Sequence, residues 1–305
     1  LASGAPTASR DMLVSTPDRH LVFFGTETTI GTKTTQDQMF IRFSSQEDIT
    51  DYVPTANNTA GTQRLADGSR IMGALRGRNA IYIWTDTALF LMRFVGAPFT
   101  FAFEQVGTNC GLIGKNAAVE VDGTVYWMSE NGFFRYGGQL ESLPCLVEDF
   151  VYDDLNTITK QHVNAGLNNL FGEINWFYVS SGANTVNRVV TYNYLDSTSE
   201  RPVWTTGTLN RTAWADSAVF GKPHATEYDT STNGTVGSAT YVQGNSDGVS
   251  IYYEHEKGLN QVKEGTESAI ASNIESGDFD ISLNNSGAAD IRGDGEYMMR
   301  ISRVI

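Results

Sequence analysis

The sequence predicts an all-β protein: a β-propeller of antiparallel blades, from which the chain leaves towards a further β-rich segment. Composition, periodicity and spacing predict this fold. Of 305 residues only 18 % are charged and 30 are glycine, which is unlike a helical bundle and suits short strands joined by frequent turns. Apolar residues alternate with a period of two along most of the chain, as they do in half-buried strands.

Five segments share one plan, in which a β-branched or aromatic strand is followed by a turn and a second strand. The paired ranges are 21–24 with 39–43, 81–84 with 89–94, 125–128 with 133–136, 174–179 with 189–194, and 249–253 with a weaker strand beyond a turn near Lys257 and Gly258. The middle three begin about 44 and 49 residues apart, which is close to the length of a four-stranded propeller blade. The longer interval before residue 249 leaves room for one irregular blade.

A shorter strand of small residues precedes three of these hairpins, at 70–75, 117–121 and 162–166. Small side chains suit an innermost strand, where blades converge. Each hairpin that follows carries a tryptophan at a similar point, and we expect these indoles to pack between blades. The three tryptophans are Trp84, Trp127 and Trp176.

The rest of the chain divides into a short helix and a distinct C-terminal stretch. Residues 146–155, after Pro144, predict a short acidic helix, whereas residues 272–295 are polar and rich in glycine and asparagine before a final strand at 297–305. We therefore expect the propeller to span 1–270. Residues 271–305 would form an exit loop and strand leading into another β-rich domain, and we expect the native chain to be longer.

The net charge of −14, from 35 acidic and 21 basic residues, argues against a clamp on duplex DNA and against docking on an anionic membrane. No apolar run approaches the roughly 18 residues of a membrane-spanning helix, and no signal peptide is visible. Cys110 and Cys145 are expected to be free, buried thiols, with a disulfide as the less favoured alternative. Two cysteines are too few for a structural zinc site.

No motif for catalysis or cofactor binding is present. The histidines, His20, His162, His224 and His255, lack metal-ligand spacing. Glu254 and Glu256 should point away from His255, so we expect a solvated strand end there. Carboxylates near the C-terminus could bind calcium, but they do not follow an EF-hand pattern and are expected to lie in a charged loop. They are Asp278, Asp280, Asp290, Asp294 and Glu296. We expect no enzymatic activity, cofactor or metal.

Several blocks of sequence, taken in order, carry a resemblance. They include DRHLVFFG at 18–25 and VDGTVYWM at 121–128, with further blocks at 41–48, 57–61, 84–89, 107–114 and 173–178. This series resembles the tail nozzle (tail-stabilising) proteins of short-tailed bacteriophages, and the likeness covers most of residues 10–260.

The resemblance implies a structural virion protein that assembles in the bacterial cytoplasm as a homo-oligomeric ring, commonly a hexamer, at the end of the phage tail. The ring would continue the genome-ejection channel and contact an adaptor ring above and fibres or a plug below. It implies no catalytic residue and no specific binding of the DNA that passes through. Like charge along the lumen would let the duplex slide. Candidate lumen-lining residues are Glu148, Asp149, Asp153 and Asp154.

Two other functions stay open at this point. A glycan-binding propeller for recognition of the host surface would present exposed aromatic side chains on one face, for which Tyr252 and Tyr253 are candidates. A propeller hydrolase would need a pair of placed carboxylates, and no pattern in the sequence identifies such a pair.

Overall fold

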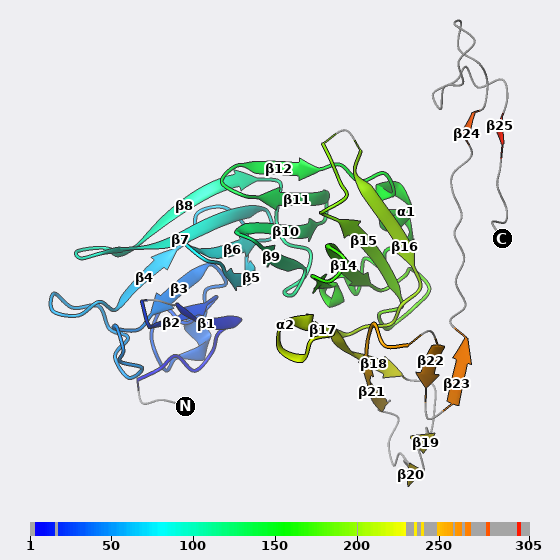
Figure 1. The fold of residues 1–305 in the computed structure, drawn as a ribbon. Helices are drawn as coiled ribbons and strands as arrows, with labels where there is room; N and C mark the ends of the chain where they lie inside the picture. The colour runs from blue at the N-terminus through cyan, green and yellow to red at the C-terminus, as the bar shows by residue number, and fades with distance from the viewer. Residues whose placement is uncertain are drawn as a thin grey trace, which may run out of the picture. The chain divides into compact units, whose positions relative to one another are not determined.

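The computed structural model describes residues 4–15, 18–199, 201–229, 235–236, 239–240, 249–258, 260–263, 266–269, 279–280 and 298–299. These residues form an all-β protein with five antiparallel sheets of three or four strands (Figure 1). The chain divides into two compact units. The first comprises Leu1–Asn233 and Val242–Glu256, and the second comprises Gly234–Tyr241 and Lys257–Ile305.

Four four-stranded sheets follow one another in the first unit, and in each sheet consecutive strands pair with each other. Sheet 1 contains β1 (Asp11–Ser15), β2 (His20–Phe24), β3 (Phe40–Phe43) and β4 (Gly61–Arg64). Sheet 2 contains β5 (Ile71–Arg76), β6 (Ile81–Thr85), β7 (Ala88–Gly96) and β8 (Thr100–Thr108). Sheet 3 contains β9 (Ala118–Val121), β10 (Thr124–Ser129), β11 (Gly132–Tyr136) and β12 (Leu140–Leu143). Sheet 4 contains β13 (Asn164–Asn168), β14 (Glu173–Tyr178), β15 (Arg188–Asn193) and β16 (Val203–Gly207).

These sheets confirm the first four predicted hairpins, which are β2–β3, β6–β7, β10–β11 and β14–β15. The three predicted strands of small residues are confirmed as β5, β9 and β13, each of which is the first strand of its sheet.

The fifth predicted hairpin is wrong. Sheet 5 contains β17 (Ala213–Ala215), β18 (His224–Asp229) and β21 (Val249–Glu254), in that order. β21 pairs along its whole length with β18, which precedes it. The strand after β21, β22 (Asn260–Lys263), pairs instead with β23 (Thr266–Ala269) in the second unit. A long-range partner thus replaces the local return strand that the sequence predicted.

Short helices join some of the sheets. The predicted acidic helix is confirmed as α1 (Glu148–Asp154), which follows the last strand of sheet 3 and buries Val151. α2 (Ser217–Phe220) connects β17 to β18 and ends at Gly221, whose φ of 76° suits a left-handed cap. Two single 3-10 turns, η1 (Lys33–Thr35) and η2 (Lys160–His162), lie in connecting loops.

Neighbouring sheets of the first unit pack face to face, and this explains why their middle strands are apolar on both sides. In β6 every residue is buried. Ile81 and Ile83 belong to the core shared with sheet 1, whereas Tyr82 and Trp84 belong to the core shared with sheet 3. A strand buried on both faces reads as a continuous apolar run rather than an alternating one.

The three tryptophans pack between sheets, as predicted, and all are fully buried. Trp84 and Trp127 share one layer, with ring centroids 5.5 Å apart. Trp176 lies in the next layer, 5.0 Å from the ring of Phe133. The indole N–H of Trp127 donates to the carbonyl of Cys110 (2.8 Å), and that of Trp176 donates to the carbonyl of Ala117 (3.0 Å).

The first strands of the sheets lie against one another. β1 contacts β5, and β13 contacts both β9 and β17. Asn116 and Asn164 form a parallel bridge between the starts of β9 and β13, and Arg10 donates through Nε to the carbonyl of Ile71 (2.9 Å). These first strands therefore run in the same direction. Gly73 allows close approach, since a Cβ there would lie 2.7 Å from the carbonyl oxygen of Lys115.

The second unit holds three short pairings: β19 (Thr235–Val236) with β20 (Ala239–Thr240), β22 with β23, and β24 (Phe279–Asp280) with β25 (Met298–Met299). The expected boundary near residue 270, and the side chains of Asp278, Asp280, Asp290, Asp294 and Glu296, lie outside the described residues. Of the predicted final strand at 297–305, the structure describes Met298–Met299.

Candidate functional site

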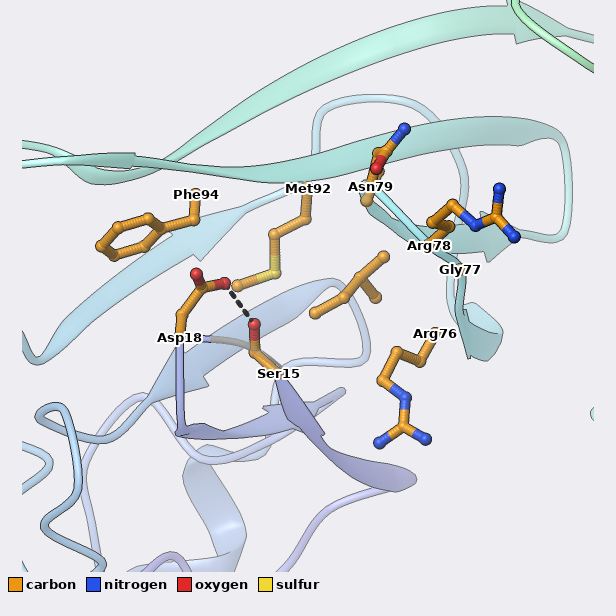
Figure 2. A pocket seen from close by; sticks show the side chains of 10 residues that line it. Ser15, Asp18, Arg76, Gly77, Arg78, Asn79, Met92 and Phe94 are labelled. Carbon is orange, nitrogen blue, oxygen red and sulfur yellow. Dashed lines mark hydrogen bonds between the residues drawn. The ribbon is translucent and has the colours of Figure 1, made fainter. Parts of the chain in front are cut away.

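A cavity of about 280 Å³ lies between the β1–β2 turn, the β5–β6 turn and strand β7 (Figure 2). Its floor is apolar and is formed by Ile81, Met92 and Phe94. Ile81 and Met92 are buried, whereas Phe94 is 43 % exposed. The β5–β6 turn contributes the sequence Arg76-Gly77-Arg78 to the rim. The cavity thus combines an apolar floor with two basic side chains.

The charged groups at this rim differ in their contacts. Ser15 donates through its hydroxyl to Asp18 (2.8 Å), which holds that carboxylate on the β1–β2 side. The exposed side chains of Arg76 and Arg78 make no hydrogen bond or ion pair with the described residues. In Figure 2 their guanidinium groups point away from each other, so they do not converge on one small anion.

Unpartnered charges gather at two places in the described part of the chain. Cationic side chains without a hydrogen bond or ion pair are Lys33, Arg70, Arg76, Arg78 and Arg201, of which Arg76 and Arg78 lie together at the β5–β6 turn and Arg70 lies at the other end of β5. Carboxylates without such a partner are Asp122, Glu148, Asp149 and Asp153, three of which lie on α1. Most other described charges are paired, as Arg135 is with Glu141 and Lys160 with Glu130.

The four residues predicted to line a lumen all lie on α1, but their surroundings differ. Asp154 forms an ion pair with Arg188 (Oδ2 to Nε, 3.2 Å). Glu148 is half-buried beside Gly132 of the β10–β11 turn. Asp149 and Asp153 are exposed and flank Phe150, whose side chain is 53 % exposed. Lining a lumen is a property of an assembled ring, and this role stays a prediction.

Tyr152 fixes α1 to the end of sheet 3. Its hydroxyl donates to the carbonyl of Ser129 (2.7 Å) and accepts from the backbone N–H of Gly132 (3.2 Å). Burial raises the pKa of this hydroxyl far above its ordinary value. Lys160, just beyond the helix, also pairs with Glu130 of the β10–β11 turn (2.5 Å). α1 therefore has a defined position at this turn.

The cavity and α1 lie at opposite ends of the strands of the first unit. Because the first strands run in the same direction, the β5–β6 turn lies at the end where first strands finish. The β10–β11 turn, which contacts α1, lies where they begin. The end with the β5–β6 turn thus carries the unpartnered Arg76 and Arg78, and the end with α1 carries three unpartnered carboxylates.

A second cavity, of about 300 Å³, lies where β5, β9, β13 and β17 meet. Lys115 at its edge is neutralised by Asp11 of β1 (2.9 Å). Two lining residues have polar atoms without a hydrogen-bond partner, Trp84 (Nε1) and Asn164 (Oδ1). Both atoms are buried, so a molecule in the cavity would not contact them. These two unpartnered atoms therefore do not mark a ligand site in the second cavity.

A polar cluster in sheet 5 is structural. Arg211 is buried, donates through Nε to His255 (Nε2, 2.8 Å) and lies 4.1 Å above the ring of Tyr253. Its ion pair with Glu227 spans 3.5 Å. Burial, together with the charge of Arg211, lowers the pKa of His255 to about 4. The expected solvated strand end is thus wrong for His255, which packs against Trp214 with ring centroids 4.7 Å apart.

Glu27 and Arg42 tie the loops of sheet 1 together. Glu27 is buried and accepts hydrogen bonds from Thr7 and from the backbone N–H of Gly31 (2.7 Å). Burial raises the pKa of Glu27, but these hydrogen bonds outweigh it and keep the pKa below its ordinary value. Arg42 donates to the carbonyls of Thr28 (2.8 Å) and Tyr52 (3.1 Å). All partners are loop groups of the same sheet, which indicates a structural role.

Within the described ranges, no group of three His, Cys, Asp or Glu side chains could hold a metal ion. Cys110 and Cys145 are free, as predicted, with Cys110 buried and Cys145 half-buried. In the same part of the chain, no helix has the length and apolar character needed to cross a bilayer.

No family model matches the chain, and no curated protein is significantly similar to it.

Sequence reasoning overlooked the cavity of the β5–β6 turn. The available signal was Arg76-Gly77-Arg78, two basic residues around a glycine between two apolar strands.

Proposed function

We propose that this chain is a structural virion protein, a subunit of a ring-shaped tail nozzle of a short-tailed bacteriophage. The observation that carries the proposal is the repeated sheet: four consecutive meanders pack face to face, with their first strands side by side. We interpret the five sheets as propeller blades, since radial repetition of four-stranded sheets defines that architecture. The resemblance of residues 10–260 to nozzle proteins supports the same function.

In this proposal the subunits form a homo-oligomeric ring that continues the genome-ejection channel, and the DNA passes without specific binding. The ring contacts an adaptor above and fibres or a plug below, and it assembles in the bacterial cytoplasm before it becomes part of the virion. Large loop surfaces on a rigid scaffold suit a protein that works through its contacts. The net charge of −14 suits a conduit that must not retain phosphate.

Electron microscopy tests this function directly. The purified chain should form rings with a central opening, and a serum raised against it should label the tail tip of the virion that carries it. Labelling of the capsid shell, or of no part of the virion, would contradict the proposal.

A second function, binding of host-surface glycans, is favoured by one observation on sheet 5. Tyr252 is 63 % exposed and stacks on His224, with ring centroids 5.3 Å apart. Phe220, also 63 % exposed, lies 4.6 Å from the same imidazole. Tyr253, in contrast, is in contact with Arg211, so Tyr252 is the better candidate. A glycan array should then give a signal that Tyr252→Ala abolishes, and no signal would exclude this function.

A further inference from the structure

Building on the proposed ring, we propose that the cavity at the β5–β6 turn receives helix α1 of a second copy of this chain. Arg76 and Arg78 of one subunit would meet Asp149 and Asp153 of the next, and Phe150 would pack on the cavity floor. If the chain forms no ring, this contact fails together with the proposed function.

Charge complementarity selects this occupant. Of the described carboxylates without a hydrogen bond or ion pair, three of four lie on α1, and of the corresponding cations two of five, Arg76 and Arg78, line the cavity. Opposite charges that are left free at separate places on one surface are available to steer and orient association. Asp18, the acid at this rim, is held by Ser15 on the opposite side of the cavity.

The apolar groups match in the same way. Phe150 and Leu146 beside it are 53 % and 77 % exposed, although both are large and apolar. The cavity offers Ile81, Met92 and Phe94 as a floor. Its volume of about 280 Å³ is below the roughly 300–1,000 Å³ of sites for drug-sized ligands. The cavity therefore suits a protruding side chain better than a whole small molecule.

The position of the two surfaces determines the kind of assembly. They differ in composition and lie at opposite ends of the strands, so each subunit presents one surface to the preceding copy and the other to the following copy. Such a heterologous contact closes into a ring when the rotation between copies permits. A self-complementary contact would instead produce a two-fold dimer.

Charge reversal tests the contact in the full chain. Arg76→Glu with Arg78→Glu, and separately Asp149→Arg with Asp153→Arg, should each weaken self-association at least about tenfold, because like charges then face each other. Sedimentation velocity over a concentration series measures this, with circular dichroism to show that each variant is folded. The matched control is Lys33→Glu with Arg201→Glu, which changes the same number of unpartnered cations elsewhere and should leave association unchanged.

Rescue makes the test specific. The variant that carries all four substitutions keeps the net charge of the original chain but exchanges the two signs, and it should recover ring formation. An equimolar mixture of the two double variants should also assemble, since every contact between unlike copies is then attractive. Phe150→Ser should weaken association without any change in charge.

Three outcomes would overturn the inference. Rings that form equally well in both charge-reversed variants would show that the subunits contact each other through other surfaces. That result would not contradict the proposed nozzle function. Loss of heparin or duplex DNA binding in the arginine variant, with association intact, would assign the arginines to phosphate contacts. A wild-type chain that stays monomeric at all concentrations would contradict both proposals.

Discussion

His255 illustrates how a single buried contact changes the chemistry of a residue. Its Nε2 accepts a hydrogen bond from Arg211, so the imidazole is neutral and carries its proton on Nδ1. A second positive charge at this place would face the guanidinium directly. The sequence predicted alternation at this strand end correctly, with Glu254 and Glu256 exposed. It did not indicate the buried arginine, which comes from a loop 44 residues away.

We expect this contact to make stability depend on pH. The pKa of His255 is about 4 in the folded protein and about 6.5 in an unfolded chain. The contribution of neutral His255 to the free energy of unfolding is fully present above pH 6.5. It is lost as the pH falls towards 4, because the unfolded chain binds the proton at a higher pH than the folded protein does. The full shift corresponds to about 3 kcal/mol, and solvent screening of the half-buried imidazole reduces its contribution to stability below that figure.

Urea unfolding at pH 7.5 and pH 4.5 measures the effect. The wild type should lose more stability between the two values than His255→Gln, which can still accept from Arg211 but does not titrate. Burial also lowers the pKa of His20, so part of the dependence should remain in the variant. Equal losses in both proteins would show that His255 does not contribute.

The two cysteines should be unreactive in the folded protein. Burial raises the pKa of Cys110 to about 11 and that of Cys145 to about 12, and thiolate is the reactive form. A thiol reagent at pH 8 should therefore react slowly with native protein and quickly with two thiols per chain in denaturant without reductant. A count of zero in denaturant would show that the cysteines are bonded.

At the scale of elements, the sequence predicted the strand pairs whose members are neighbours along the chain and missed a pair whose members are not. Hairpins of sheets 1 to 4 join neighbouring strands across a turn or loop, so alternation and turn residues were sufficient. β18 and β21 pair across the whole stretch from Asp229 to Val249, and no local signal marks such a partner. The arginines of the cavity rim were missed for a related reason, since their setting depends on the β1–β2 turn of another sheet.

The close packing of first strands gives a test at this scale. Gly73→Ala would place a Cβ 2.7 Å from the carbonyl oxygen of Lys115, and the backbone would have to shift. We expect a loss of roughly 1–3 kcal/mol in the free energy of unfolding. Gly182→Ala is the matched control, because it has no atom within 4 Å of the new methyl group. Equal stability of the two variants would contradict close packing at β5.

At the scale of the whole molecule, the carboxylates of α1 could have either of two roles in an assembled ring. Lining the lumen, as the sequence suggested, requires its carboxylates to face DNA, whereas the subunit contact requires them to face arginines. We expect Asp149→Asn with Asp153→Asn to reduce the yield of assembled tails and to leave the ejection rate per assembled particle unchanged. Normal assembly with slower ejection at low salt would favour the lumen role, and single-particle ejection assays separate the two.

Because each of the first four sheets is continuous in sequence, each can complete its hydrogen-bond ladder as soon as its last strand leaves the ribosome. Synthesis can therefore add one finished sheet at a time, and each new sheet covers the apolar face of the one before it. Sheet 5 breaks this order. β18 must wait with one edge unpaired until β21 has been made, and the second unit begins within that interval. Sheet 5, at the end of the first unit, is thus the sheet whose folding must wait for the synthesis of residues beyond the start of the second unit.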